Sequence, residues 1–327
     1  MKNILVTGGA GFIGTNFIKH TLKEYPDVRI WNLDALTYAA NANIGEMFNI
    51  LGKSDAYSWT MGDICDRWVV DRMLTKHNID TIVHFAAETH VDRSINDAGV
   101  FIETNVMGTY SLLEAASQTN CHFHHISTDE VYGSLGKDDP PFTEKTPYAP
   151  NSPYSASKAA SDHLVRAYHH TYGLPVTITN CSNNYGPYQH REKFIPTIIT
   201  NAINGKPIPI YGDGKQVRDW MHVDDHCRAI DDVIRNGRVG ETYNVGGGTQ
   251  PTNIDIALTI CHMLDILLPK DCLHKSLIKH VEDRLGHDTR YAVDYTKIWL
   301  ELGWSPEMPL AKGLMETVKW YVERETA

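Results

Sequence analysis

A glycine-rich turn near the N-terminus constrains the fold of this chain more than any other feature of its sequence. Gly8, Gly11 and Gly14 follow an apolar run at residues 4–6 and precede apolar positions with helical spacing. In a strand–turn–helix unit, the first glycine permits the tight turn and the second lets the backbone approach a pyrophosphate. The third lets the helix pack closely against the sheet. The pattern predicts a βαβ opening whose helix N-terminus binds a phosphate group.

An acidic residue at the end of the second predicted strand indicates which dinucleotide binds there. Asp34 follows the glycine turn at the spacing where a carboxylate accepts hydrogen bonds from ribose hydroxyls and repels a 2′-phosphate, which favours NAD over NADP. A plain turn followed by a surface aspartate is the alternative. Asp63 and Ile64 lie where an adenine edge is expected, although a solvated turn explains that pair nearly as well. The predicted cofactor-binding residues are Gly8, Gly11, Phe12, Ile13, Gly14, Asp34, Asp63, Ile64, Tyr154 and Lys158.

Short apolar runs alternate with helix-period segments through the first half of the chain. Predicted strands cover residues 4–6, 30–33, 81–85, 124–127 and 176–179, and predicted helices cover 67–77, 99–117 and 152–172. This alternation predicts an α/β fold with a Rossmann-type, doubly wound parallel sheet. Glycines and prolines break the rhythm later, until helical patterns return at 253–267 and 310–322. We predict an NAD-binding domain over residues 1–180 and a smaller, mixed α/β substrate-binding lobe over 181–327, with segments near 219–245 as candidates to rejoin the first domain.

Composition and charge exclude several classes of partner. Asp and Glu number 40 against 30 Lys and Arg, so the formal net charge is −10. We therefore expect no binding to nucleic acid or to an anionic membrane surface. No apolar run approaches the roughly 18 residues of a membrane-spanning helix. The N-terminal residues run directly into the glycine turn, without the apolar core of a signal peptide.

The cysteines and histidines show no spacing typical of metal ligands. The sequence has six cysteines but no C-x-x-C pair, and no H-E-x-x-H motif among its 17 histidines. His122, His124 and His125 form the densest cluster, but no nearby cysteine or carboxylate completes a tetrahedral set. We predict no metal site, reduced thiols and a cytoplasmic location.

A tyrosine and a lysine share one face of the helix predicted over residues 152–172. Tyr154 and Lys158 are four residues apart, a spacing that places side chains on the same side of a helix. A phenol with a pKa of about 10 is a poor base at neutral pH, but an ammonium group and a positive nicotinamide ring favour the phenolate. Tyr154 is therefore a candidate base toward a sugar hydroxyl, and Lys158 a candidate ligand of the nicotinamide ribose. A surface pair is the alternative, and the dinucleotide-binding opening disfavours it.

Two adjacent carboxylates follow the strand predicted at residues 124–127. Asp129 and Glu130 come after Thr128 at the carboxyl end of that strand, where open α/β sheets place their chemistry. Carboxylates in one cleft separate their pKa values, so that one can act as an acid and the other as a base. A solvated acidic turn capped by Thr128 is the alternative reading of this short segment taken alone.

These features together resemble the extended short-chain dehydrogenase/reductases, and among them the dTDP-glucose 4,6-dehydratases. The resemblance covers essentially the whole chain, and its most specific piece is STDEVYG at residues 127–133, because same-fold epimerases usually lack the Asp-Glu pair. UDP-glucuronate decarboxylases usually keep the Glu without the Asp. The matching segments are the glycine turn, Asp34, residues 85–94 (FAAETHVDRS), 127–133, Tyr154 with Lys158, 180–189 (NCSNNYGPYQ), 212–220 (GDGKQVRDW) and 283–288 (DRLGHD).

The resemblance implies a three-stage reaction in which NAD is regenerated. Tyr154, assisted by Thr128 and Lys158, removes the O4 proton of a nucleotide hexose while C4 gives its hydride to NAD. Glu130 then takes the C5 proton, and protonated Asp129 donates to the leaving C6 hydroxyl. The hydride returns to C6, which yields a 4-keto-6-deoxy sugar nucleotide and water.

The resemblance also implies which residues bind the nucleotide sugar, although each could instead be a surface charge or a structural ion pair. Cations suit the diphosphate, Asn184 matches a phosphate contact, Glu88 and Arg93 organise the sugar side, and His287 lies near the nucleotide. The cations are Lys193, Arg218 and Arg284. The sequence departs from the family pattern at residues 190–194, Leu285 and Gly99, on the phosphate and base side of the expected site, which keeps a UDP-sugar as an alternative substrate.

The prediction is therefore an NAD-dependent hydro-lyase that converts dTDP-D-glucose to dTDP-4-keto-6-deoxy-D-glucose. A UDP-sugar 4,6-dehydratase or epimerase of the same fold is one alternative, and a non-catalytic NAD-binding regulator is another. The four residues Asp129, Glu130, Tyr154 and Lys158 argue against the regulator, because pure binding does not need them. The resemblance further implies a homodimer, with the helices near residues 99–117 and 152–172 as candidate interface.

Overall fold

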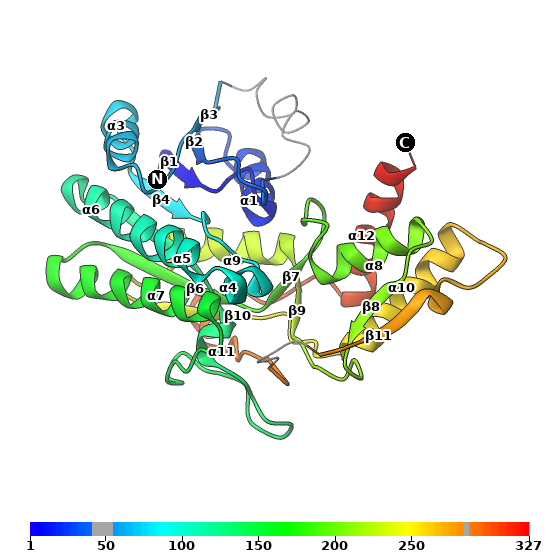
Figure 1. The fold of residues 1–327 in the computed structure, drawn as a ribbon. Coiled ribbons are helices and arrows are strands. Elements are labelled where there is room, and N and C mark those ends of the chain that lie inside the picture. Colours follow the sequence, from blue (N-terminus) through cyan, green and yellow to red (C-terminus); the bar gives the residue numbers. More distant parts are fainter. Residues whose placement is uncertain (41–54, 284–287, 327) are drawn as a thin grey trace.

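The computed structural model describes residues 1–40, 55–283 and 288–326 of the chain. Its centre is a sheet of seven parallel strands in the order β10-β6-β5-β4-β1-β2-β3 (Figure 1). The strands are β1 (Asn3–Thr7), β2 (Arg29–Asp34), β3 (Tyr57–Met61), β4 (Thr81–His84), β5 (His122–Thr128), β6 (Val176–Cys181) and β10 (Thr242–Val245). This architecture confirms the predicted Rossmann-type α/β fold.

The strand order reverses between β1 and β4, which creates the topological switch point of the sheet. In register, Thr7 at the end of β1 pairs with Leu33 of β2 and His84 of β4, so the three strands end at nearly the same level. The chain leaves β1 toward one edge of the sheet and returns at β4 toward the other. Ligands of open α/β sheets bind in the crevice that such a reversal leaves beyond the carboxyl ends of the strands.

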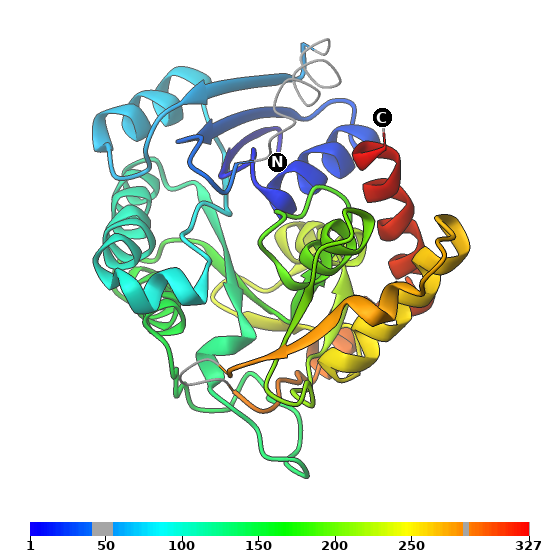
Figure 2. The ribbon, with the colours of Figure 1, turned by 45° about the vertical axis from the view of Figure 1, so that its right-hand side comes forward.

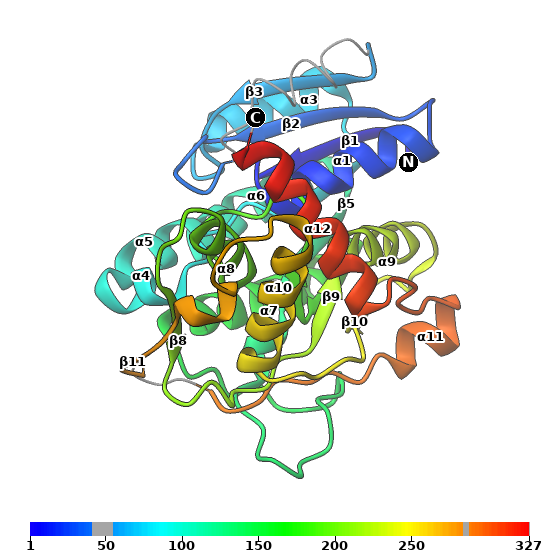
Figure 3. The ribbon, with the colours of Figure 1, turned by 90° about the vertical axis from the view of Figure 1, so that its right-hand side faces the viewer.

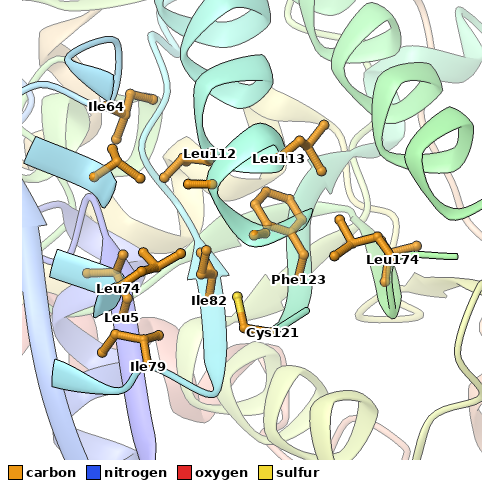
Figure 4. Close-up of a cluster of buried hydrophobic side chains, with 14 of the residues drawn as sticks. Leu5, Ile64, Leu74, Ile79, Ile82, Leu112, Leu113, Cys121, Phe123 and Leu174 are labelled. Carbon is orange, nitrogen blue, oxygen red and sulfur yellow. The ribbon is translucent and has the colours of Figure 1, made fainter. Parts of the chain in front are cut away.

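Helices cover both faces of the sheet. One face packs against α3 (Arg67–His77), α6 (Thr109–Thr119) and α7 (Pro153–Tyr172), and the other against α1 (Phe12–Glu24) and α9 (Val223–Asn236) (Figure 2). Figure 4 shows the first of these cores, where Leu5, Ile82 and Phe123 of the sheet meet Leu74 of α3 and Leu112 of α6. Because both faces are covered, inner strands such as β1 and β4 are buried along nearly their whole length, without alternation.

The helix predicted over residues 99–117 is one continuous helical rod that contains a widened, π-helical turn. It consists of α5 (Ala98–Phe101), a π-helical segment η1 (Ile102–Gly108) and α6, and the short helix α4 (Val91–Asn96) precedes it. In the widened turn, the carbonyl oxygen of Asn105 accepts from Thr109 Oγ1 and Ser161 Oγ, both at 2.6 Å. Side-chain hydroxyls thus satisfy a backbone group that an ordinary α-helix would pair internally.

The C-terminal part of the chain forms a smaller lobe beside the sheet (Figure 3). Helices α8, α10 and α12 pack together around an apolar core of their own. Two small parallel sheets, β7 with β9 and β8 with β11, lie outside the central sheet. The remaining elements are β7 (Asn183–Tyr185), α8 (Phe194–Ile203), β8 (Ile208–Tyr211), β9 (Trp220–His222), α10 (Asn253–Leu267), η3 (His274–Leu277), β11 (Ile278–Val281), α11 (Thr296–Leu302) and α12 (Leu310–Glu325).

Two segments from the second half of the sequence belong to the central sheet. Strand β10 pairs with β6 at the edge of the sheet, and α9 packs against α1. The domain boundaries at residues 1–180 and 181–327, with residues 219–245 rejoining the first domain, remain a prediction. Helix α9 packs on the central sheet through its apolar face. Val223, Cys227 and Ile230 of this face are buried against side chains of the β-strands and of α1.

Three further findings concern the part of the chain that the structure describes. All six cysteines are free thiols. No helix among the described residues is long and apolar enough to cross a bilayer. Within the same residues, no group of three His, Cys, Asp or Glu side chains is arranged to hold a metal ion. In the histidine cluster, His124 Nδ1 instead lies 2.8 Å from Thr177 Oγ1 in the protein core.

Candidate active site

A cavity of about 330 Å³ opens at the carboxyl ends of the central strands. Its wall combines the glycine turn after β1, the segment after β4, the end of β5, one face of α7 and the segment after β7. Most of the predicted site residues meet there. Those that line it are Gly8, Gly11, Phe12, Ile13, Gly14, Asp34, Asp63, Ile64, Glu88, Thr128, Asp129, Glu130, Tyr154, Lys158, Asn184 and Lys193. The structure thus brings residues from distant parts of the sequence into one chamber.

The glycine turn needs its glycines for different reasons. Gly8 has φ +71°, and a Cβ there would lie 2.6 Å from the backbone nitrogen of Ala86. A Cβ on Gly14 would lie 2.5 Å from the carbonyl oxygen of Gly8, because the helix packs closely on the turn. The N–H of Gly11 donates to the Gly8 carbonyl at 3.1 Å and closes the turn. The backbone surface that results is open toward the cavity at the N-terminus of α1.

Asp34 is fixed at the end of β2 by backbone groups. Its carboxylate accepts from Ala10 N and Leu36 N, both at 2.8 Å, so β2 and the glycine turn hold it jointly. Burial raises the pKa of this carboxyl, and the two backbone donors act in the opposite direction. Glycine turn, helix N-terminus and fixed carboxylate lie along one wall, which is the arrangement that an NAD pyrophosphate and ribose require. The residues present therefore fit NAD.

The Thr-Asp-Glu cluster begins where β5 ends. Thr128 closes the strand, and its Oγ1 accepts from Glu130 N at 3.2 Å, which caps the short 3-10 turn η2 (Asp129–Tyr132). Asp129 is 2% exposed, and among the described residues its Oδ2 has no hydrogen-bond partner. Burial, followed by the negative charges of Glu130 and Asp219, raises the pKa of Asp129 well above its usual value. This environment favours the protonated form of the Asp129 carboxyl.

Helix α7 places Tyr154 and Lys158 opposite that cluster. Ser152 caps the helix by accepting from Ser155 N, and Pro153 starts its first turn, so the helix begins directly before Tyr154. Tyr154 and Lys158 are 8% and 5% exposed. Lys158 Nζ donates to the carbonyl oxygen of Ile126 at 2.8 Å, which holds the ammonium group at the cavity floor.

The residues of the chain alone favour the phenol form of Tyr154. Burial and then the charge of Glu130 raise its pKa well above the usual value, while a hydrogen bond with Thr128 acts in the opposite direction. Burial also lowers the pKa of Lys158 to about 8. The sequence shows the lysine and implies the nicotinamide ring. Only the fold reveals that the Tyr154 phenol is desolvated and lies near the Glu130 carboxylate.

On the substrate side, Glu88 and Arg93 are linked through a tyrosine that the sequence did not single out. Tyr38 OH donates to Glu88 Oε2 at 2.9 Å, and the Arg93 guanidinium lies over the Tyr38 ring at 3.6 Å. Arg93 Nη2 also donates to Glu192 Oε2 at 3.3 Å. Glu88 and Glu192 line the cavity, whereas Arg93 reaches it only through them. The role of Arg93 at the sugar side remains a prediction.

The predicted nucleotide-binding residues are less closely grouped. Lys193 lines the cavity, and its Nζ donates to the Thr89 carbonyl at 2.9 Å. Asn184 also lines the cavity, with its Oδ1 held 3.0 Å from His226 Nδ1. Arg218 lies outside the cavity wall, where its guanidinium donates to the carbonyls of Val217 and Asp288. Arg284 and His287 lie outside the described residues. The phosphate roles of this group therefore stay predictions.

Sequence reasoning missed several residues that hold the site together. Asn105, in the widened turn, accepts from Glu88 N at 2.8 Å and donates from Nδ2 to the Glu88 carbonyl and to Ser157 Oγ. Its signal in the sequence is only an amide within a predicted helix, which is weak. Asp162 lies beneath Lys158 and has a stronger signal, because it continues the four-residue spacing of Tyr154 and Lys158 along α7.

In sequence, the chain is similar to dehydratases of nucleotide sugars. A family model described as GDP-mannose 4,6 dehydratase matches residues 5–317. The dTDP-glucose 4,6-dehydratases of Neisseria meningitidis serogroup B and Xanthomonas campestris pv. campestris are 51% and 53% identical to this chain. Each match covers 100% of this chain and 95% of the relative. The chain belongs to the dTDP-glucose 4,6-dehydratase family.

Solved structures of the family agree with the assignment. DesIV, a dTDP-glucose 4,6-dehydratase from Streptomyces venezuelae solved with NAD and TYD bound, is 48% identical. It superposes with a TM-score of 0.91, covering 99% of this chain and 98% of its own. The UDP-glucose 4-epimerase of Thermotoga maritima, solved with UDP-glucose, shares the fold at a TM-score of 0.87 but only 27% identity, with 99% of each chain covered. The fold is therefore common to both reactions, and sequence identity separates the dehydratase family from the epimerase.

Proposed function

We propose that this chain dehydrates dTDP-D-glucose to dTDP-4-keto-6-deoxy-D-glucose with NAD as resident cofactor. One observation carries the proposal. The chain is about half identical to dTDP-glucose 4,6-dehydratases over its full length, and its Asp129–Glu130 and Tyr154–Lys158 pairs both line one cavity that fits NAD. Elimination of water requires an acid and a base in addition to the redox tyrosine, and both are present.

The redox step uses the α7 residues. Bound NAD supplies a hydride acceptor for C4 and later a hydride donor for C6. Tyr154 takes the O4 proton, and Thr128, which hydrogen-bonds the phenol, lowers its pKa. Lys158 presents a positive charge at the cavity floor, which favours the phenolate as the proton leaves. A raised pKa also makes the Tyr154 phenolate, once it has formed, a stronger acceptor for the O4 proton.

The elimination step uses the two carboxyl groups after β5. Oxidation at C4 acidifies the C5 hydrogen, which Glu130 removes as a carboxylate and gives back to C5 when the hydride adds at C6. Asp129 donates its proton to the departing C6 hydroxyl, a role that its raised pKa supports, because an acid must still be protonated at working pH. The two neighbours share one sign of charge, so the ionised form of Glu130 stabilises the neutral form of Asp129.

An isotope experiment tests this function and discriminates it from epimerisation. With dTDP-glucose deuterated at C4, the label should reappear at C6 of the product, and in deuterated water C5 should carry deuterium. NMR of the product measures both. A product that keeps its C6 hydroxyl and its C4 label would refute dehydration and favour the epimerase alternative. The same assay with UDP-glucose tests the nucleotide, for which Asn184, Lys193, Arg218, Arg284 and His287 are the proposed ligands.

We also infer that the protein is a cytoplasmic homodimer. Apolar side chains stay exposed along the rod that α5, η1 and α6 form, and they support the predicted interface. Val100, Ile102, Met107 and Tyr110 are 42–51% exposed. Light scattering after gel filtration should give twice the chain mass, and Ile102→Asp with Met107→Asp should shift it toward the monomer. The six free thiols support a reducing compartment.

A further inference from the structure

The buried side of α7 carries a carboxylate that the proposed mechanism does not use. Asp162 lies four residues after Lys158 and eight after Tyr154, so the three side chains share one stripe of the helix. Asp162 is 0% exposed and does not line the cavity. Acidic side chains are almost never buried to this degree unless they are paired, so its position calls for a physical reason.

Asp162 is joined to Lys158 through a histidine of β5. His125 Nε2 lies 3.2 Å from Asp162 Oδ1 and 3.4 Å from Lys158 Nζ, and the His125 and Asp162 side chains are both fully buried. The other carboxylate oxygen, Oδ2, accepts from Ser127 Oγ at 2.9 Å and from Tyr148 OH at 2.8 Å. The carboxylate is thus held through Oδ2 by two hydroxyl donors, while Oδ1, which has no hydrogen-bond partner among the described residues, faces the imidazole that lies beside the ammonium group.

The charges of this cluster support one another. Burial raises the pKa of Asp162, but His125, Lys158 and the hydrogen bond from Ser127 outweigh burial and bring it below the usual value. Asp162 is therefore ionised at neutral pH. Burial lowers the pKa of Lys158 to about 8, and the Asp162 carboxylate is the first group that opposes this decrease. His125, with a pKa lowered to about 4 by burial and then by Lys158, stays neutral.

Other titratable groups surround the pair on every packed element. Each of these groups interacts electrostatically with Lys158, Asp162 or His125. They come from the strands, from α7 and from the segment before α7. They are His84 of β4, His124 of β5, Cys181 of β6, Arg166 of α7, and Tyr132 and Tyr148. Among these groups and the pair itself, Asp162 is the carboxylate, so it is the anion that balances Lys158 from below.

We propose that Asp162 is a positioning residue that keeps Lys158 as an ammonium group at the cavity floor. This inference rests on the proposed function, in which the charge of Lys158 favours the Tyr154 phenolate. Asp162 touches neither substrate nor cofactor and takes part in no bond change. Its effect is electrostatic, because an ion pair that is broken inside the protein leaves the remaining charge without compensation.

Thermal unfolding of a double-mutant cycle tests the pairing without any enzyme assay. The four proteins are wild type, Lys158→Met, Asp162→Asn and the double variant. Asp162→Asn should lower the melting temperature strongly in the wild type and much less in Lys158→Met, because the second background contains no buried ammonium to leave unpaired. If Asp162→Asn does not fold alone, a folded double variant supports the pairing. Equal decreases in melting temperature in both backgrounds would overturn the pairing. It would also be overturned if neither Asp162→Asn nor the double variant folded.

The pH dependence of NADH formation on mixing with dTDP-glucose tests the functional consequence. Loss of an opposite charge at this range shifts a pKa by about 1 unit or more, so the alkaline limb of Asp162→Asn should move to lower pH by that amount. At the wild-type midpoint, a shift of about 1 unit lowers the ammonium fraction from one half to about one eleventh, a decrease of roughly fivefold. Asp162→Glu, which keeps the charge, should restore the limb. A uniform loss at every pH, with the limb unmoved, would mean that Asp162 is only structural.

A second buried carboxylate provides the matched control. Asp231 on α9 accepts from Arg235 and is 5% exposed, but it lies outside the cavity wall. Asp231→Asn should lower stability without moving the alkaline limb, and a shift as large as that of Asp162→Asn would overturn the assignment. A wild type that forms no NADH with dTDP-glucose would refute the proposed function instead, while the melting cycle would still decide whether Asp162 pairs with Lys158.

Discussion

The dinucleotide side of the cavity and its substrate side are built in different ways. On the dinucleotide side, Asp34 and the glycine turn come from β1, β2 and the connection between them, and backbone N–H groups of Ala10 and Leu36 fix the carboxylate. On the substrate side, Glu88 and Arg93 come from residues 85–94 and Glu192 from a distant segment, and they depend on side-chain contacts with Tyr38 and with one another.

The difference teaches which substitutions should have local effects. When a carboxylate held by backbone groups is substituted, the neighbouring residues keep their positions, because the strand and the turn remain. When a side chain held by other side chains is substituted, the side chains that contact it are also affected. Between the two sides lie the proposed catalytic residues of η2 and α7, whose loss should affect the reaction most.

The largest expected effect is on the catalytic floor that both sides share. Tyr154→Phe removes the base for O4, so NADH formation on mixing with dTDP-glucose should slow by about 10²–10⁴-fold. NAD binding should change little, because the ring remains. Stopped-flow absorbance measures the first quantity and fluorescence titration the second. Tyr172→Phe, an exposed tyrosine of the same helix, is the control. Undiminished NADH formation in Tyr154→Phe would assign the base to another group.

A comparable loss, confined to the second stage, is expected for the carboxyl pair. Asp129→Asn cannot protonate the leaving hydroxyl and Glu130→Gln cannot take the C5 proton, so dehydration should slow by about 10²–10⁴-fold. C4 oxidation should continue, and NADH should persist with a 4-keto, 6-hydroxy intermediate visible by rapid quench. Asp138→Asn, in an exposed segment, should match wild type. Loss of NADH formation itself would contradict the separation into two stages.

A smaller effect is expected on the dinucleotide side alone. Asp34→Ala removes hydrogen bonds to a charged group, worth about 1.5–3 kcal/mol, so NAD should bind roughly 10- to 150-fold more weakly. Rejection of NADP should relax, because the negative charge is gone. Calorimetric titration with both dinucleotides measures this, with Asp27→Ala in the exposed turn before β2 as control. Equal NAD affinity in Asp34→Ala and wild type would exclude Asp34 from the ribose site.

The smallest effect should appear on the substrate side. Tyr38→Phe deletes the hydrogen bond to Glu88, and a net loss of about 1 kcal/mol predicts a roughly fivefold higher KM for dTDP-glucose. The affinity for NAD should stay unchanged, since Asp34 and the glycine turn keep their backbone contacts. Steady-state kinetics with NAD titration in parallel measure both. A change in NAD affinity as large as the change in KM would show that the two sides are one unit.

Much of the dinucleotide side could be predicted because its residues are close in sequence. Gly8, Gly14 and Asp34 belong to one strand–turn–helix–strand unit, whose backbone geometry fixes them whatever the rest of the chain does. The widened turn at Asn105 and the link from Tyr38 to Glu88 could not be predicted in this way. Both depend on contacts between segments far apart in the sequence, and no local spacing encodes them.

The sequence by itself determined the parallel sheet, the binding of a dinucleotide at the glycine turn, and the residue types needed for redox and elimination. These follow from periodicity and from short-range spacing, which local backbone physics converts into structure. The tertiary structure alone decided the protonation states. Burial raises the pKa of Asp129 and lowers that of Lys158, and a carboxylate four residues further along α7 balances the lysine from inside the fold. Desolvation is a property of the packed chain, because it depends on what surrounds a group in space.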